Sequence, residues 1–244
     1  TKPENHQVSR AVDAILASER PVIYAGGGTI SSNASKELRE LNDLIDAPVT
    51  NTLMGLGVFP GTHKRFLGML GMHGTYQANM AMHNADLIIA LGARFDDRIT
   101  NAPDKFAPRA KVIHFDVDHS SVSKIIEADI AVFGQIKDSL QAINNHLKTK
   151  IDEIDNDKLA PWHQQISDWK EKHGLNHDLY KIEDDSRPIL PQAAVQHIYQ
   201  ESQGKAFVTS DVGQHQMFAA QYYHFDEPRK LSLIHISEPT RRLN

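Results

Sequence analysis

The amino-acid sequence predicts a doubly wound α/β fold, in which helices cover both faces of a mostly parallel, six-stranded sheet of Rossmann-like type. Short apolar runs that indicate buried strands alternate with amphipathic, helix-forming segments through residues 1–147. Several of these runs lead directly into glycines, as strands do at the carboxyl edge of a parallel sheet. A chain of 244 residues with 40% hydrophobic residues is also large enough to bury the core of such a fold.

The elements of the first domain follow from residue spacing and from turn-forming residues. Five strands can be placed on apolar runs at residues 22–25, 48–52, 87–91, 111–115 and 130–133. Helices are expected at residues 7–20, 33–45, 75–84, 120–126 and 136–147. Pro21 ends the first helix, Asn33 is expected to cap the second, and Asp118 is expected to cap the fourth.

Glycines follow three of the predicted strands, at Gly26–Gly28, at Gly55 and Gly57, and at Gly92. A glycine in this position allows a ligand to approach the backbone. None of these loops has the GxGxxG spacing of a dinucleotide-binding motif, and a tight turn explains each of them taken alone. Because parallel strands end at one edge of a sheet, the three loops together indicate a ligand site there.

The stretch LGMHGT, residues 70–75, and the stretch ALGARFDDR, residues 90–98, are the strongest candidates for that site. The first leads into a helix, whose free N–H groups suit an anion, and the second follows a buried strand. Asp116 ends the next strand and is a candidate acceptor for ribose hydroxyls. Gly134 and Gln135 repeat the pattern of a strand followed by glycine. The sequence therefore predicts a nucleotide-type site built from several loops.

Residues 148–187 are charged and are interpreted as an interdomain connector. Both tryptophans of the chain, Trp162 and Trp169, lie there, and packing of a helix explains them better than a binding platform does. Residues 188–230 are expected to form a second, truncated α/β unit. In that unit Gly213, Gln214 and His215 open a helix, which suits a diphosphate, although an ordinary polar helix cap is the alternative.

Composition excludes several functional classes. The net charge of −5 and the pI near 6.2 provide no basic stripe, so we expect no nucleic-acid partner. The absence of cysteine excludes a disulfide scaffold, a thiolate nucleophile and a zinc-thiolate site. The fourteen histidines lack HxH or HExxH spacing, and we assign no metal ligand. No apolar signal or membrane-spanning run is present, so we expect a cytoplasmic protein.

Three segments carry a resemblance to a known family: LGMHGTYQANMAMHNAD, GARFDDR and DVGQHQMFAAQYY, in this order and at matching separations. They are similar to the catalytic large subunit of acetolactate synthase (acetohydroxyacid synthase), a thiamine-diphosphate-dependent family, and the resemblance extends over residues 8–230. Members of this family have a thiamine-activating domain, a middle FAD-binding domain and a third domain that binds the diphosphate through a metal. The resemblance implies that this chain is a fragment containing the middle domain and the start of the third.

The resemblance also implies cofactor-binding residues. FAD contacts are expected at Gly27, Thr52, Leu53, Leu70, Gly71, Met72, His73, Gly92, Ala93, Arg94, Phe95, Asp96, Asp116 and Val117. Gln135 occupies a position where the family usually has Asp, so it offers an amide oxygen there and no carboxylate. Gln214 and His215 match contacts to thiamine diphosphate, which the family binds with Mg²⁺. No catalytic residue can be assigned.

For the parent enzyme, the resemblance implies condensation of two pyruvates, or of pyruvate and 2-oxobutyrate, with loss of CO₂. The products are 2-acetolactate and 2-aceto-2-hydroxybutyrate, in branched-chain amino acid biosynthesis, and FAD has a structural role. Homo-oligomers and a regulatory small subunit are the expected partners, and the fragment alone is expected to be inactive. The alternatives are another thiamine-dependent oxo-acid decarboxylase or carboligase, and a stand-alone nucleotide-binding module.

The last residues, 231–244, contain LSLIHISEPTR, which resembles the translation of a sequencing adapter. We therefore expect a non-native tail that packs poorly or is disordered. A first residue of Thr1 in place of Met also suggests that the chain is cut from a longer protein.

Overall fold

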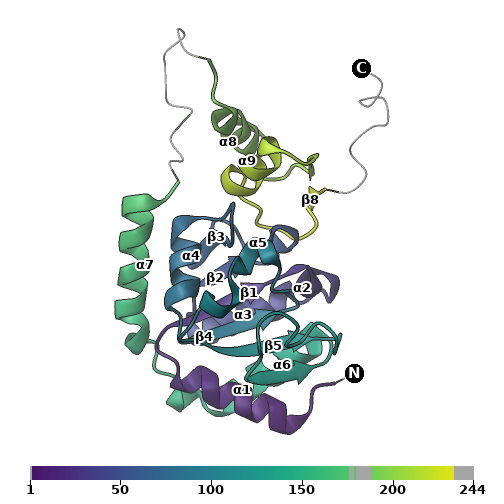
Figure 1. The fold of residues 1–244 in the computed structure, drawn as a ribbon, viewed down its shortest axis with the longest axis vertical. Helices are drawn as coiled ribbons and strands as arrows, with labels where there is room; N and C mark the ends of the chain where they lie inside the picture. Colours follow the sequence, from purple (N-terminus) through teal and green to yellow (C-terminus); the bar gives the residue numbers. More distant parts are fainter. Residues whose placement is uncertain (1, 176–178, 180–187, 234–244) are drawn as a thin grey trace.

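The computed structural model describes residues 2–175, 179 and 188–233 of the chain. Its main feature is a six-stranded sheet in which every pair of neighbours is parallel and the strand order is β3-β2-β1-β4-β5-β6. Helices lie on both faces of this sheet, and a second, smaller unit with a two-stranded parallel sheet, β7-β8, follows (Figure 1). The predicted doubly wound α/β fold is confirmed.

The elements have the following bounds. The strands are β1 Pro21–Ala25, β2 Val49–Asn51, β3 Phe66–Met69, β4 Leu87–Leu91, β5 Lys111–Asp116, β6 Ile130–Phe133, β7 Val208–Thr209 and β8 Leu231–Ser232. The α-helices are α1 Asn5–Ala17, α2 Gly27–Ser31, α3 Ser35–Ile45, α4 Tyr76–Asn84, α5 Asp97–Thr100, α6 Ile136–Thr149, α7 Ala160–His173, α8 Pro191–Ser202 and α9 Gln214–Tyr222.

The strand order places the change of direction of the chain at the centre of the sheet. The chain begins at β1, moves outward through β2 and β3, and returns to form β4 on the other side of β1. β1 and β4 pair in register over their whole length, from Pro21 with Leu87 to Ala25 with Leu91. The carboxyl ends of the two strands therefore lie side by side, which is where open α/β sheets bind ligands.

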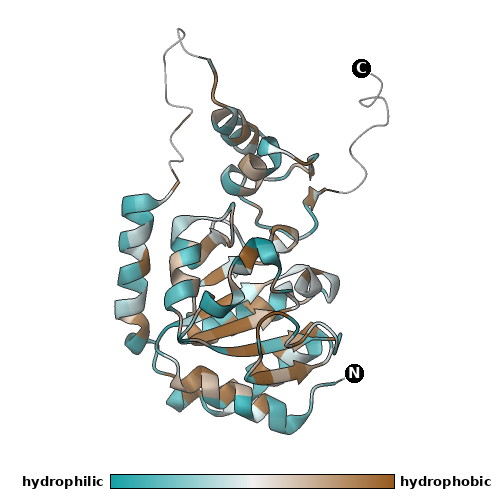
Figure 2. Cartoon of the chain, viewed as in Figure 1, coloured by the Kyte–Doolittle hydropathy of each residue, from teal (hydrophilic) through white to brown (hydrophobic). Residues whose placement is uncertain are grey.

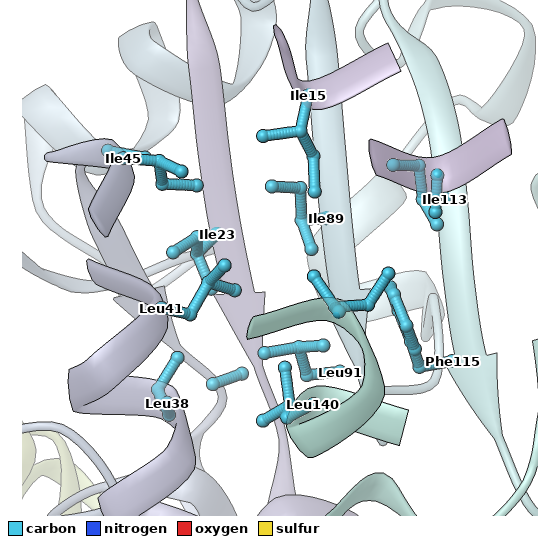
Figure 3. Packing of buried hydrophobic residues seen from close by; sticks show 14 of the residues in the cluster. Ile15, Ile23, Leu38, Leu41, Ile45, Ile89, Leu91, Ile113, Phe115 and Leu140 are labelled. Atoms are coloured by element: carbon cyan, nitrogen blue, oxygen red, sulfur yellow. The ribbon is translucent and has the colours of Figure 1, made fainter. Parts of the chain in front are cut away.

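Alternation of side chains along the strands divides the core into two layers. Ile23, Ile89 and Ile113 face α1, α3 and α6, in a cluster that also contains Leu38 and Leu140 (Figure 3). The residues between them in sequence face the opposite side. Val22, Tyr24, Ile88 and Val112 pack there against α4 and α7. Strands buried on both faces explain the continuous apolar runs in the sequence, and hydropathy colouring shows them as apolar ribbons inside more polar helices (Figure 2).

Helix α7 joins the packing of the second layer. Trp162 is buried, and its Nε1 donates a hydrogen bond to the carbonyl oxygen of Pro21 at 3.2 Å. Trp169 packs edge-on against Trp162, with ring centroids 5.9 Å apart. The two tryptophans therefore stabilise the contact of α7 with the sheet, as the packing interpretation predicted.

The structure corrects three local predictions. The sixth strand, β3, was not identified from the sequence, because it is a short edge strand whose Gly68 has a φ of +93°. Asn33 does not cap a helix: its φ is +52°, α3 begins two residues later, and α2 precedes it. Turns replace the helix expected at residues 120–126. Asp118 stabilises these turns by accepting hydrogen bonds from Ser120 N and Ser121 Oγ at 2.9 and 3.0 Å.

The second unit packs against the β2 and β3 side of the first domain. Tyr223 and Phe225, which follow α9, form a buried cluster with Leu56 and Met69. Asp226 also accepts hydrogen bonds from the backbone N and the hydroxyl of Thr62, both at 2.9 Å. These contacts hold the segment after α9 against the main sheet.

The first residues of the expected tail are ordered, contrary to our prediction for them. Leu231 and Ser232 form β8, which pairs with β7, and Leu231 packs against the buried cluster that contains Tyr223. Backbone hydrogen bonds of 2.7 and 3.1 Å, from Val208 N to Lys230 O and from Ser210 N to Ser232 O, hold the pair together. Residues 234–244 lie outside the described part of the chain. None of the described helices combines the length and the apolar character required to cross a membrane.

We predict that Leu140→Ala lowers the free energy of unfolding by about 2–5 kcal/mol, because it removes a fully buried side chain and leaves a cavity in the larger layer. Urea unfolding followed by circular dichroism measures this. The matched control is Asn145→Ala on the exposed side of the same helix, which should change stability by less than about 0.5 kcal/mol. Equal effects of the two substitutions would contradict the packing described here.

Candidate functional site

A groove with a volume of about 540 Å³ lies at the carboxyl edge of the main sheet. It is lined by residues that follow four different strands. They are Gly27 and Gly28 after β1; Thr52, Leu53 and Met54 after β2; Gly92, Ala93, Arg94, Asp96, Arg98 and Ile99 after β4; and Asp116 and Ser121 at and after β5, with Tyr24 of β1 itself. One continuous site is therefore built from segments almost one hundred residues apart.

Glycine is required where the loops after β1 and β4 meet. Gly28 N donates a hydrogen bond to Gly92 O at 3.0 Å, and Gly26 N donates one to Leu91 O at 2.9 Å. A Cβ atom on Gly92 would lie 2.7 Å from Gly28 Cα, and Gly92 has a φ of +53°. Side chains would push the two loops apart, so the glycines allow the backbones to form the end of the groove together.

Tyr24 lies beneath this groove and supports the loop that carries Arg94. Its hydroxyl donates to the backbone oxygen of Arg94 at 3.5 Å, and its ring packs against Phe95 with centroids 5.7 Å apart. Burial, together with the negative charge of Asp96, raises the pKa of Tyr24 well above its ordinary value. The hydroxyl therefore remains a neutral donor at physiological pH.

Two arginines extend from the same loop into solvent. The side chain of Arg94 is 81% exposed, and that of Arg98 is 71% exposed. Among the described residues, the ion pairs of both arginines are long, 3.8 Å from Arg94 to Asp96 and 3.6 Å from Arg98 to Asp97. Exposed ion pairs of this kind are weak, so both guanidinium groups can turn to an anionic ligand at small cost. Because the chain has a net charge of −5, local donors such as these two arginines would have to attract an anionic ligand.

The structure brings many of the predicted site residues together on the groove: Gly27, Thr52, Leu53, Gly92, Ala93, Arg94, Asp96 and Asp116. The loop of residues 70–73 adjoins it on the side of Arg98. Met72 N donates to Arg98 O at 2.9 Å, and a Cβ on Gly71 would lie 2.6 Å from Ile99 Cδ1. Leu70 lines a neighbouring hollow that also contains Ile99. His73 lies in the same loop, and its carbonyl oxygen accepts a hydrogen bond from Gln221.

Other predicted residues do not line the groove. Phe95 points into the core, where it contacts the rings of Tyr24, Phe106 and His114. Val117 is half-exposed just beyond Asp116, and Gln135 lies at the start of α6, 3.4 Å from the hydroxyl of Ser32. Gln214 and His215 are exposed at the start of α9 in the second unit.

Sequence reasoning missed several residues that line the groove: Tyr24, Gly28, Met54, Arg98, Ile99 and Ser121. Gly28 and Arg98 belong to the glycine run 26–28 and to the stretch 90–98, which the sequence does indicate as parts of a ligand site. Tyr24 lies within an apolar strand, where the sequence suggests only a core residue. Nothing in the sequence distinguishes Ser121, because it reaches the groove through the turn that replaces the expected helix.

The arrangement suits an anionic ligand that also carries hydroxyl groups. Arg94 and Arg98 can pair with phosphate charges, and Asp116 offers a carboxylate that accepts hydrogen bonds from hydroxyls. Among the described residues, no group of three or more His, Cys, Asp or Glu side chains is arranged to hold a metal ion. The groove itself therefore indicates binding of a nucleotide-like molecule through side-chain and backbone donors.

Comparison with known proteins shows which family the chain resembles. Residues 8–143 match the family described as "Thiamine pyrophosphate enzyme, central domain". The chain is 49% identical over 230 residues to an acetolactate synthase large subunit of Buchnera aphidicola subsp. Schlechtendalia chinensis. This alignment covers 94% of this chain and 39% of that relative. It is 46% identical to the acetolactate synthase isozyme 3 large subunit of Escherichia coli (strain K12), over 92% of this chain and 38% of the relative. A chloroplastic acetolactate synthase 3 of Brassica napus is 40% identical over 93% of this chain, which spans 34% of it.

We predict that Gly92→Ala lowers the free energy of unfolding by about 2–5 kcal/mol. The backbone of Gly92 is left-handed, a conformation that is strained for alanine, and the new Cβ would also clash with Gly28. Urea unfolding measures the difference. Gly27→Ala is the matched control, since a Cβ there would meet Met54 Cβ at an ordinary 3.4 Å, and it should alter stability by less than about 0.5 kcal/mol. If both substitutions were tolerated, the loops after β1 and β4 could not be in close contact.

Proposed function

The chain belongs to the thiamine pyrophosphate enzyme family, whose central domain residues 8–143 match, and we propose that it is the FAD-binding portion of an acetolactate synthase large subunit. The chain spans less than two fifths of the length of the relatives described above. The parent enzyme would condense two pyruvates, or pyruvate and 2-oxobutyrate, with loss of CO₂. This reaction yields 2-acetolactate or 2-aceto-2-hydroxybutyrate, the entry to branched-chain amino acid biosynthesis.

The observation that carries the proposal is the convergence of the loops after β1, β2, β4 and β5 on one groove. FAD is a long anion with a diphosphate at its centre and a ribose at one end, so its binding requires donors and acceptors spread along a surface. Arg94 and the backbone amides of the Gly92 loop would hold the diphosphate, and Asp116 would accept hydrogen bonds from the ribose. Met54 and Leu53 offer apolar surface on the opposite side of the groove.

Thiamine diphosphate, when bound with Mg²⁺ in the parent enzyme, supplies the electron sink for decarboxylation of a 2-oxo acid. The described chain offers only part of such a site. Gln214 and His215 are exposed at the start of α9, where an amide, an imidazole and free backbone N–H groups could donate to a diphosphate. We assign no catalytic residue and no metal ligand to this chain, and we expect it to be inactive alone.

The remaining features of the parent enzyme stay predictions from the resemblance: self-association of large subunits, a regulatory small subunit and a cytoplasmic location. A different thiamine-dependent decarboxylase or carboligase is less well supported, because the relatives described above are named acetolactate synthases. A stand-alone nucleotide-binding module is also less well supported, because these alignments extend through 92–94% of the chain.

Titration of the full 244-residue chain with FAD tests the proposal directly. Quenching of flavin fluorescence should saturate at one FAD per chain. When thiamine is added as a competitor, it should not displace FAD, and the flavin fluorescence should stay unchanged. Circular dichroism of the same sample establishes that the chain is folded. A folded chain that does not bind FAD would overturn the proposed function and favour a thiamine-dependent enzyme without flavin.

We predict that Arg94→Ala weakens FAD binding by about 10- to 100-fold, because it removes a charge-assisted contact to the diphosphate. The dissociation constant from the flavin titration is the measurement. Arg39→Ala, which removes an exposed cation from α3 outside the groove, should leave the dissociation constant within about twofold of the unsubstituted chain. Unchanged affinity of the Arg94 variant would exclude this residue from the diphosphate contact.

A further inference from the structure

A fully buried histidine, His114, lies in the second layer beneath the ligand groove. It belongs to β5, two residues before Asp116, so alternation along the strand places both side chains on the same face of the sheet. His114 Nε2 is 3.9 Å from Asp116 Oδ2. The imidazole also packs edge-on against Phe95, with centroids 5.4 Å apart. It therefore lies next to the end of β5 and to the loop after β4, which both contribute residues to the groove.

Packing alone does not account for a histidine at this position. Within the described residues, neither ring nitrogen of His114 makes a hydrogen bond of normal geometry, and the nearby backbone carbonyl of Ala93 gives at most a distorted one. Leaving polar atoms buried in this way is unfavourable relative to an apolar side chain of similar size. The neighbours on the adjacent strand β4 are apolar, with Ala90 directly opposite. A phenylalanine or leucine would fill the space without this cost.

The carboxylate of Asp116 is oriented from two sides. Its Oδ1 accepts a hydrogen bond from Asp118 N at 2.9 Å, and its Oδ2 faces His114. Burial lowers the pKa of His114 below its ordinary value, although the charge of Asp116 and the carbonyl of Ala93 act in the opposite direction. The imidazole is then neutral at physiological pH, and proximity to the carboxylate favours the tautomer with the proton on Nε2.

Resting on the proposed function, we infer that His114 is a positioning residue for FAD. Its imidazole orients the Asp116 carboxylate relative to the turn that contains Ala93 and Arg94. The acceptor for the ribose and the donors for the diphosphate belong to different strands, and their separation must match the cofactor. His114 is placed between the two, with one nitrogen toward Asp116 and its ring against Phe95, the residue after Arg94. It acts through Asp116 and makes no contact with the ligand itself.

A double-mutant cycle on the full chain tests this inference. The dissociation constant for FAD is measured for the unsubstituted chain, His114→Phe, Asp116→Asn and the double variant. We expect each single substitution to weaken binding about tenfold and the double variant to be within about twofold of the weaker single variant, because both remove the same contact. His114→Gln, which retains a side-chain N–H, should recover affinity to within about threefold of the unsubstituted chain.

Three outcomes would overturn the inference: FAD affinity of His114→Phe equal to that of the unsubstituted chain, additive losses of about 100-fold in the double variant, or no recovery by His114→Gln. A general loss of structure is distinguished by urea unfolding of the same four proteins. The unfolding data also provide a cycle that needs no ligand, in which His114 and Asp116 should show non-additive effects. If the unsubstituted chain fails to bind FAD, the proposed function fails, and the unfolding cycle still decides whether His114 orients Asp116.

Discussion

The parallel, in-register pairing of β1 with β4 is the constraint on which the rest of this structure depends. It ends both strands at the same level and brings the following loops so close that they share backbone hydrogen bonds, from Gly26 N to Leu91 O and from Gly28 N to Gly92 O. Only residues without a Cβ allow this approach at Gly28 and Gly92. Because the two strands are central, the groove that begins at their ends is supported on both sides by further strands.

The two layers of side chains convert this pairing into a rigid support. One layer, with Ile23 and Ile89, holds the sheet against α1, α3 and α6, and the other contains Tyr24 and His114 immediately beneath the groove. The polar atoms of the second layer are directed to loops: Tyr24 to the backbone of Arg94, and His114 toward Asp116. A layer that is otherwise apolar therefore places polar atoms next to the backbone of Arg94 and the carboxylate of Asp116. On the proposed function, this is how a chain of net negative charge would hold an anionic cofactor.

Much of the fold was accessible from the sequence because the signals are local. The apolar runs at 87–91 and 130–133 coincide with β4 and β6, and Thr75 caps α4 by accepting a hydrogen bond from Ala78 N. The failures are equally physical. β3 is a short edge strand, and Gly68, a residue disfavoured in strands, interrupts its apolar run. Residues 120–126 are mainly serine and β-branched residues, which are weak helix formers, and hydrogen bonds from Ser120 and Ser121 to Asp118 favour turns.

The sequence by itself determined the class of fold, most elements and the glycine exits, because periodicity and glycine placement depend on near neighbours in the chain. It also indicated Arg94 and Asp116 as ligand-binding residues. Only the tertiary structure decided that Tyr24, Ile99 and Ser121 line the same groove while Phe95 leaves it for the core. These outcomes depend on strand order and on which face of each strand is covered. Such properties arise from packing between segments distant in sequence, which no local pattern records.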